Sequence, residues 1–163
     1  MVSDLREEWL DFVGQRLAPH ALPLVAVLRR LIEQPYPPEV ASLDFELFPD
    51  GFTEGFPARA FFMDERNSEV FVERDGGLHY PGSVDPELIE IDSIWTLEEE
   101  EDFLERDGGE EISDDLWECA TLVFLEWFEA CWIRAGGVDF PLRAALMPHD
   151  DPDAMRLLPT AAG

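Results

Sequence analysis

His149, Asp150, Asp151 and Asp153 are the one local group of residue types in this sequence that could ligate a metal ion. Carboxylate oxygens are the ligands that Ca²⁺ and Mg²⁺ prefer. The spacing matches no EF-hand loop, in which alternate acids precede a glycine, and acids around Pro152 are also typical of a turn that starts a helix. We therefore expect a turn without a metal. The alternative is a carboxylate-based metal-binding module or enzyme that uses this cluster.

No other pattern in the sequence indicates catalysis. His20 and His79 stand near no serine or cysteine in a Gly-x-Ser-x-Gly elbow. The phosphate-binding patterns Gly-x-x-x-x-Gly-Lys and Gly-x-Gly-x-x-Gly are absent, as is lysine itself. With 37 acidic residues, two carboxylates within reach of each other are expected by chance, so such a pair says little about acid–base chemistry. We expect a protein that is not an enzyme, with no catalytic residue and no cofactor.

The segment from residue 85 to residue 118 is unusually acidic. Sixteen of its 34 residues are Asp or Glu and only Arg106 is basic, so it carries −15 of the chain's formal −26. Charge at this density lowers stability by self-repulsion, and Glu98 with Asp102, or Glu101 with Glu105, are like-charge pairs one helical turn apart. Helix-dipole effects explain only the first acids of a helix. Two reasons for the segment remain, a positively charged partner or an unusually saline cytoplasm.

We expect the acidic segment to bind the partner. Large aromatic residues within a charged rim are common at protein interfaces, and Trp95 and Phe103 flank the densest run of acids. Trp117 follows the run, and the alternative is that all three aromatic side chains fix a short helix to the core. The predicted partner-binding residues are Trp95, Glu98, Glu99, Glu100, Glu101, Asp102, Phe103, Glu105, Asp107, Glu110 and Glu111.

Composition excludes several classes of protein. A hydrophobic fraction of 46% with 12 Phe and 5 Trp excludes the disordered acidic class, which lacks aromatic residues. The negative charge should repel nucleic acid and anionic lipid, because their phosphates need clustered cations. The most apolar stretch, residues 116–133, contains Glu118, Glu126 and Glu129 and is a poor membrane span. We expect no direct nucleic-acid or membrane binding, and a single domain over residues 1–163 with a loose tail after about residue 160.

Two features predict a cytoplasmic location. The N-terminus leads directly into Glu7 and Glu8, without the basic and apolar regions of a secretion signal. Cys119 and Cys131 are twelve residues apart, which is about 18 Å on one helix, whereas a disulfide needs Cα atoms within about 7 Å. Two unpaired thiols, which we expect to be small core residues, are typical of a reducing cytosol.

Hydrophobic spacing predicts an α+β fold. Apolar residues recur at helical intervals in residues 4–17, from Pro23 to about residue 34, and in 97–106 and 113–136. The last of these helices is apolar on most sides, so we expect it in the centre of the fold. Alternation indicates strands at 43–47, 58–64, 69–74 and 78–80, with an edge strand at 88–91. Because these strands follow one another through short turns, we expect an antiparallel β-meander of three to five strands, packed with the N-terminal helices and a long, largely buried C-terminal helix.

This order of helices, meander and helices, with Leu22-Pro23 after the first helix, resembles the SUKH-like immunity superfamily of bacteria. The aromatic residue that those proteins carry soon after the Leu-Pro pair is missing here. No Asn-Gly-Gly follows the pair either, since the similar Asp75-Gly76-Gly77 falls on the predicted hairpin. No family binding residue is therefore carried over. The resemblance implies an acidic immunity or inhibitor protein that occludes a basic partner, such as a toxin or nuclease domain. Charge complementarity would accelerate that capture.

Overall fold

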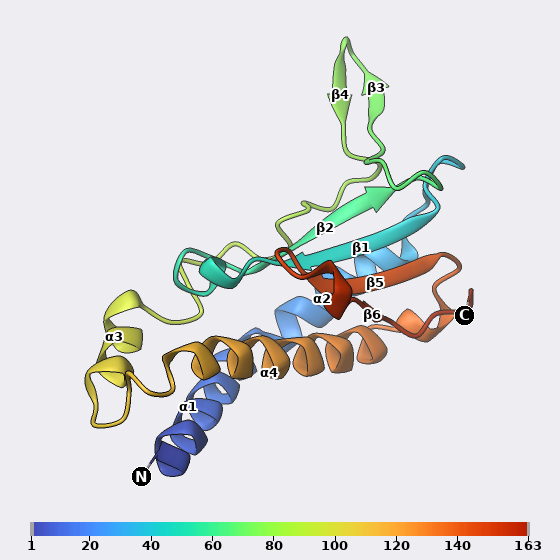
Figure 1. Cartoon of the computed structure of the whole chain (residues 1–163). Helices are drawn as coiled ribbons and strands as arrows, with labels where there is room; N and C mark the ends of the chain where they lie inside the picture. Colours follow the sequence, from blue (N-terminus) through green and yellow to red (C-terminus); the bar gives the residue numbers. More distant parts are fainter. Residues whose placement is uncertain (1, 163) are drawn as a thin grey trace.

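The computed structural model describes residues 2–162, apart from the side chains of Val2, Ser3 and Pro49. The α-helices are α1 (Val2–Leu17), α2 (Ala21–Glu33), α3 (Leu97–Glu105) and α4 (Ser113–Arg134). The strands are β1 (Ser42–Leu47), β2 (Ala58–Met63), β3 (Val72–Arg74), β4 (Gly77–His79), β5 (Arg143–Pro148) and β6 (Arg156–Leu157). Figure 1 shows the long α4 beneath the sheet. The predicted α+β class and the long C-terminal helix are confirmed.

Helix boundaries follow local chemistry, with small differences from the prediction. α1 begins at Val2, so Asp4 lies inside its first turn. α2 begins at Ala21, which puts Pro23 in the first turn, where its missing N–H costs no hydrogen bond. α4 runs for 22 residues and ends before Gly136, whose φ of 98° is the left-handed conformation that closes many helices.

The main sheet is mixed rather than an antiparallel meander. Its strand order is β2-β1-β5-β6, in which β1 pairs antiparallel with β2 but parallel with β5. A parallel pair needs a long crossover, and here it consists of everything between β1 and β5, including β2, the β3–β4 hairpin, α3 and α4. Within the main sheet the predicted antiparallel order is therefore correct only for the β1–β2 hairpin, because the chain returns through the helices to place β5 against β1.

The third and fourth predicted strands form a separate two-stranded hairpin, β3–β4. Its turn is Asp75-Gly76, with φ values of 51° and 79°, as in the two-residue turns that suit strand twist. Glu69 makes only an isolated bridge to Met63 at the edge of β2. Figure 1 shows this hairpin projecting from the body at the end farthest from α3.

The predicted edge strand at 88–91 is wrong. Leu88 adopts a φ of 69° and donates its N–H to the Asp85 carbonyl at 3.0 Å, which makes this segment a turn. A single backbone bond, from the Ala60 N–H to the Pro86 carbonyl at 2.8 Å, joins the segment to β2. Alternation over four residues is too short to distinguish a strand from a turn in which Leu88 is buried and Ile89 and Ile91 are half-buried.

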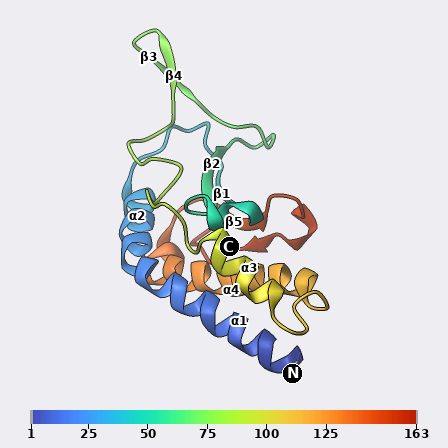
Figure 2. The same ribbon diagram turned by 90° about the vertical axis from the view of Figure 1, so that its left-hand side faces the viewer.

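The core lies between the inner face of the sheet and the helices, which Figure 2 shows below and to one side of the strands. Phe45 of β1 is fully buried, with its ring 4.8 Å from Phe128 and 5.8 Å from Trp132, both of α4. Trp9 of α1 is also fully buried, and its indole N–H donates to the Leu116 carbonyl at 2.8 Å. The sheet and α1 therefore both pack against α4, the predicted central helix.

The cysteines and the C-terminal segment are held against this core. Cys119 and Cys131 both lie on α4 and are free, and burial raises the pKa of the Cys131 thiol to about 11, which keeps it protonated. The segment that was expected to be loose donates the Ala161 N–H to the Phe140 carbonyl at 3.0 Å. The indole of Trp132 donates to the Pro159 carbonyl at 2.8 Å. Gly163 lies outside the described residues.

Phe45→Ala should lower the free energy of unfolding by about 3–5 kcal/mol, because it removes a fully buried ring and leaves a cavity. The measurement is urea denaturation followed by tryptophan fluorescence. Phe71→Ala is the matched control, since that ring is 41% exposed beside the projecting hairpin and should cost under about 1 kcal/mol. Equal costs for the two variants would contradict this description of the core.

Candidate partner-binding surface

Helix α3 begins with the predicted capping box. The Thr96 hydroxyl accepts the Glu99 N–H at 3.2 Å, and the Glu99 carboxylate accepts the Thr96 N–H at 3.1 Å. These two bonds satisfy backbone donors that a helix N-terminus otherwise leaves unpaired. They also fix Glu99 in the first turn of α3, where its side chain is occupied with the cap.

Trp95 and Phe103 attach α3 to the body and are not exposed anchors. Trp95 is 1% exposed and stacks on Phe52 with ring centroids 4.5 Å apart. Phe103 is 8% exposed, with its ring 5.0 Å from that of Trp9. The prediction that these two residues contact a partner is therefore wrong, because neither can do so without α3 leaving the core. The alternative, that they fix the short helix, is correct.

Glu100 is the only charged residue among those described that is buried, with 5% exposure. Its carboxylate accepts the indole N–H of Trp95 at 2.8 Å. Burial raises the pKa of Glu100, the bond from Trp95 opposes that rise, and the charges of Glu101 and Asp50 add to it. Glu100 therefore belongs to the attachment of α3 and is removed from the predicted partner-binding set.

Three ion pairs tie the acidic segment to α1. Arg16 pairs with Glu99, Arg106 with Glu8, and Arg6 with Asp115. The guanidinium of Arg106 also lies over the Phe103 ring, 4.5 Å from its centroid. Each pair is partly exposed, so each adds little to stability. They hold the acidic segment in position, and they occupy the guanidinium groups of Arg6, Arg16 and Arg106.

The remaining acids of α3 form one exposed stripe. Glu98, Glu101, Asp102 and Glu105 are all exposed, and their spacing of three, four and seven residues places them on one side of a helix. None of the four has an ion-pair partner within the part of the chain that the structure describes. We call these four residues the α3 stripe. It is a coherent negative surface that faces away from the core.

The turn after α3 extends this surface. Asp107, Glu110 and Glu111 are exposed between α3 and α4. The turn requires glycine, because Gly108 has a φ of 87° and a Cβ on Gly109 would lie 2.3 Å from the Leu104 carbonyl oxygen. Seven of the eleven predicted partner-binding residues are therefore exposed on one continuous segment, and Trp95, Glu99, Glu100 and Phe103 are occupied in holding it.

The spacing of the acids along the sequence already separates the exposed residues of α3 from those that attach it to the core. Residues 98, 101, 102 and 105 follow the helical repeat, whereas 99, 100 and 103 lie on the opposite side with the aromatic residues. A helical wheel of α3 would have separated the stripe from the attachment. The ion pairs with α1 have no such signal in the sequence, because they join residues about 80 to 110 positions apart.

The C-terminal cluster does not assemble into a metal site. His149 lies against Phe48, with ring centroids 4.6 Å apart, and its Nδ1 is 3.5 Å from a carboxylate oxygen of Glu46. Asp150 and Asp151 precede the short 3₁₀ helix Pro152–Ala154, as expected for a turn. Among residues 2–162 no three His, Cys, Asp or Glu side chains are grouped so that they could hold a metal ion.

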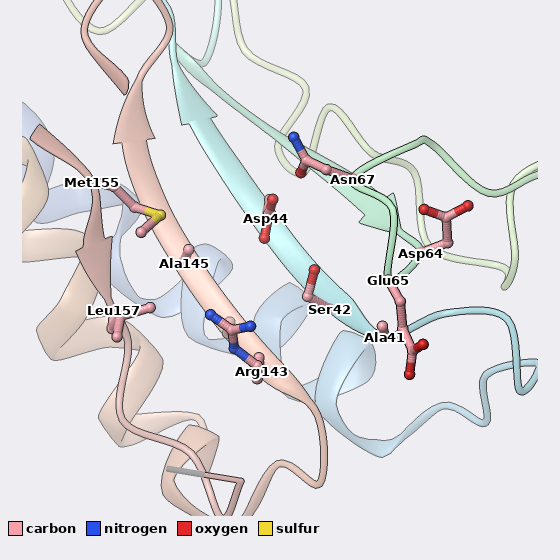
Figure 3. Close-up of a pocket in the computed structure, with 11 residues that line it drawn as sticks. Ala41, Ser42, Asp44, Asp64, Glu65, Asn67, Arg143, Ala145, Met155 and Leu157 are labelled. Atoms are coloured by element: carbon pink, nitrogen blue, oxygen red, sulfur yellow. The ribbon is translucent and has the colours of Figure 1, made fainter. Parts of the chain in front are cut away.

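A hollow of about 430 Å³ lies on the outer face of the sheet. Figure 3 shows Asp44 of β1 in this hollow, with Ser42 on the same strand, Arg143 on β5 and Asn67 on the loop after β2. Burial raises the pKa of Asp44, while the hydrogen bond with Ser42 and the charge of Arg143 lower it. No histidine or cysteine lines the hollow, and no three potential metal ligands are grouped there among the described residues.

Comparison with protein-family models, curated proteins and solved structures finds no match to this chain. No described helix combines the length and the apolar character needed to cross a bilayer. The geometry of the acidic segment is therefore the basis for assigning a function.

Glu100→Ala should lower the free energy of unfolding by about 1–3 kcal/mol, because the buried Trp95 N–H loses its acceptor. Glu100→Gln keeps an acceptor and should be at least as stable as the wild type at pH 8. The folded state holds a proton on Glu100 more tightly than the unfolded chain does. Its contribution is therefore fullest below the ordinary pKa of glutamate, about 4.3, and is lost as pH rises through the raised pKa.

The measurement is urea denaturation at pH 5 and pH 8, both above the isoelectric point near 4.1. Each variant's stability relative to the wild type should rise from pH 5 to pH 8, in parallel, with Glu100→Ala offset downward by the lost hydrogen bond. A difference that does not change with pH would contradict a pKa of Glu100 that burial raises.

Proposed function

We propose that this protein binds a basic protein partner through the α3 stripe and the turn that follows it. The supporting observation is that four like charges without partners are held on one side of a short helix whose other side is anchored in the core. Residues 98 to 105 span about 10 Å of helix, and neighbours three or four residues apart have Cβ atoms within about 6 Å, which is less than the Debye length of about 8 Å at physiological ionic strength. The four carboxylates therefore act on an approaching cation together.

The partner that fits this surface best presents clustered arginines or lysines, as the active-site cleft of a toxin or nuclease that acts on nucleic acid does. An acidic protein that covers such a cleft would act as an immunity or inhibitor protein. The anchoring of α3 supports this function, because a surface held rigid before binding loses less conformational entropy on docking.

The test compares two variants that each lose four negative charges. The stripe variant carries Glu98→Gln, Glu101→Gln, Asp102→Asn and Glu105→Gln. The hairpin variant, its matched control, carries Glu65→Gln, Glu69→Gln, Glu73→Gln and Asp75→Asn, all exposed positions at the other end of the molecule. Both have a formal net charge of −22, from −26 plus four.

Tagged wild-type protein is used to isolate the partner from the native cell lysate at low salt, and the purified pair is then measured by stopped-flow. The stripe variant should associate at least about tenfold more slowly than the wild type at 20 mM salt, and the gap should close at 500 mM. The hairpin variant should associate at nearly the wild-type rate. The partner should be basic, and its toxicity or nuclease activity should fall when the wild-type protein is present.

The free energy of unfolding of the stripe variant should be unchanged or higher than that of the wild type, since it relieves like-charge pairs one turn apart worth about 0.2–0.5 kcal/mol each. This excludes unfolding as the cause of slower capture. Equal losses for the stripe and hairpin variants would mean that only total charge matters, as expected from adaptation to high salt, and would contradict a docking surface on α3.

A further inference from the structure

A groove of about 480 Å³ lies beside the acidic segment, between α4, the 3₁₀ helix Pro49–Thr53 and the loop after β5. Figure 1 shows these two connections approaching the N-terminal half of α4 from the same side. α4 contributes one helical face to it, from Asp114 to Leu125, because the lining positions recur at intervals of three and four residues. That face is about 17 Å long, which is three turns.

The floor of the groove is apolar and accessible. Leu122 is 52% exposed, whereas the other two leucines of α4, Leu116 and Leu125, are buried. Trp117 is half-buried beside it, and Leu125 closes the floor at 3% exposure. An exposed leucine next to a partly covered indole is the arrangement that an apolar side chain of a partner can complete.

The rim of the groove is acidic on both sides. Five carboxylates line it, two from α4 and three from the opposite wall: Asp114, Glu118, Asp50, Asp150 and Asp151. No cation lines the groove, and none of the five carboxylates makes an ion pair with any residue in the described range 2–162. A negative rim without cations around an apolar floor is complementary to a segment that carries basic residues on both sides of an apolar face.

We propose that this groove binds a basic amphipathic helix of the partner, with leucine-like side chains on Leu122 and Trp117 and arginines or lysines along the rim. The proposal rests on the proposed function, since the α3 stripe attracts the partner and the groove then receives one of its helices. Asp114 lies three residues after Glu111, so the rim begins about one helical turn beyond the last acid of the preceding turn. The three-turn length of the α4 face matches a helix-in-groove contact.

The probe is a synthetic 18-residue peptide of leucine and arginine with its leucines on one helical face. A second peptide has the same composition in scrambled order, so that it is equally basic but not amphipathic. Isothermal titration calorimetry at 150 mM salt should give at least about tenfold tighter binding for the amphipathic peptide. Leu122→Glu should weaken that binding at least about tenfold, because it removes an apolar contact, although it adds a negative charge. Leu78→Glu, at a 71% exposed hairpin position, is the matched control and should not weaken it.

The direction of these changes in affinity distinguishes binding in the groove from binding by charge attraction alone. Equal binding of both peptides, or unchanged or tighter binding to Leu122→Glu, would overturn the groove assignment, because electrostatics alone would then explain the affinity. Leu122→Ser provides a second variant with no added charge and should weaken binding in the same direction. If the native partner is captured slowly by the stripe variant but normally by Leu122→Glu, the groove assignment fails while the proposed function stands. If the stripe variant captures it at the wild-type rate, the proposed function itself fails.

Discussion

The packing of α3 against α1 through Trp95, Phe103 and Trp9 is the interaction on which the acidic surface depends. A nine-residue helix is too short to be stable alone, and its outer face adds repulsion. The aromatic rings supply the missing stabilisation, because Trp95 stacks on Phe52 and Phe103 meets Trp9 edge-on. The buried bond between Trp95 and Glu100 then fixes the rotation of α3 about its axis. That rotation decides which acids face solvent.

This arrangement gives a physical meaning to the unequal roles of adjacent glutamates. Glu99 completes the cap and pairs with Arg16, and Glu100 is bonded to an indole in the core. Both are structural, although their neighbours Glu98 and Glu101 belong to the exposed stripe. A surface whose only role is to contact water does not need a helix held in one orientation, because flexible carboxylates would be hydrated equally well. The cost of self-repulsion on α3 is explained if the stripe and the groove along α4 meet one cationic partner.

Local features of the fold could be predicted from the sequence, and long-range ones could not. The capping box at Thr96, the Asp75-Gly76 turn and the apolar α4 each depend on residues close in sequence. The parallel pairing of β1 with β5 joins residues about 100 positions apart, and the short run at 143–148 has no clear alternation to indicate a strand. Turn residues between the strands favour a meander, yet the second partner of β1 lies beyond two helices.

The candidate site likewise has features that could be predicted from the sequence and features that could not. Its location on the acidic segment follows from charge density alone, and the exposed stripe follows from helical spacing. The buried state of Trp95 and Phe103 depends on α1, nearly 90 residues away, which no local pattern indicates. The groove likewise requires Asp50 and Asp150 to approach α4 from two separate connections.

The most direct test of docking on α3 is to map the contact on the protein itself by NMR. Backbone amide shifts of the isotope-labelled wild-type protein should be recorded as the purified basic partner is added. We expect the largest changes and line broadening at residues 97–111, weaker changes along the exposed face of α4, and none on the β3–β4 hairpin. Changes centred on the hairpin or on the outer face of the sheet, with α3 unaffected, would contradict the account.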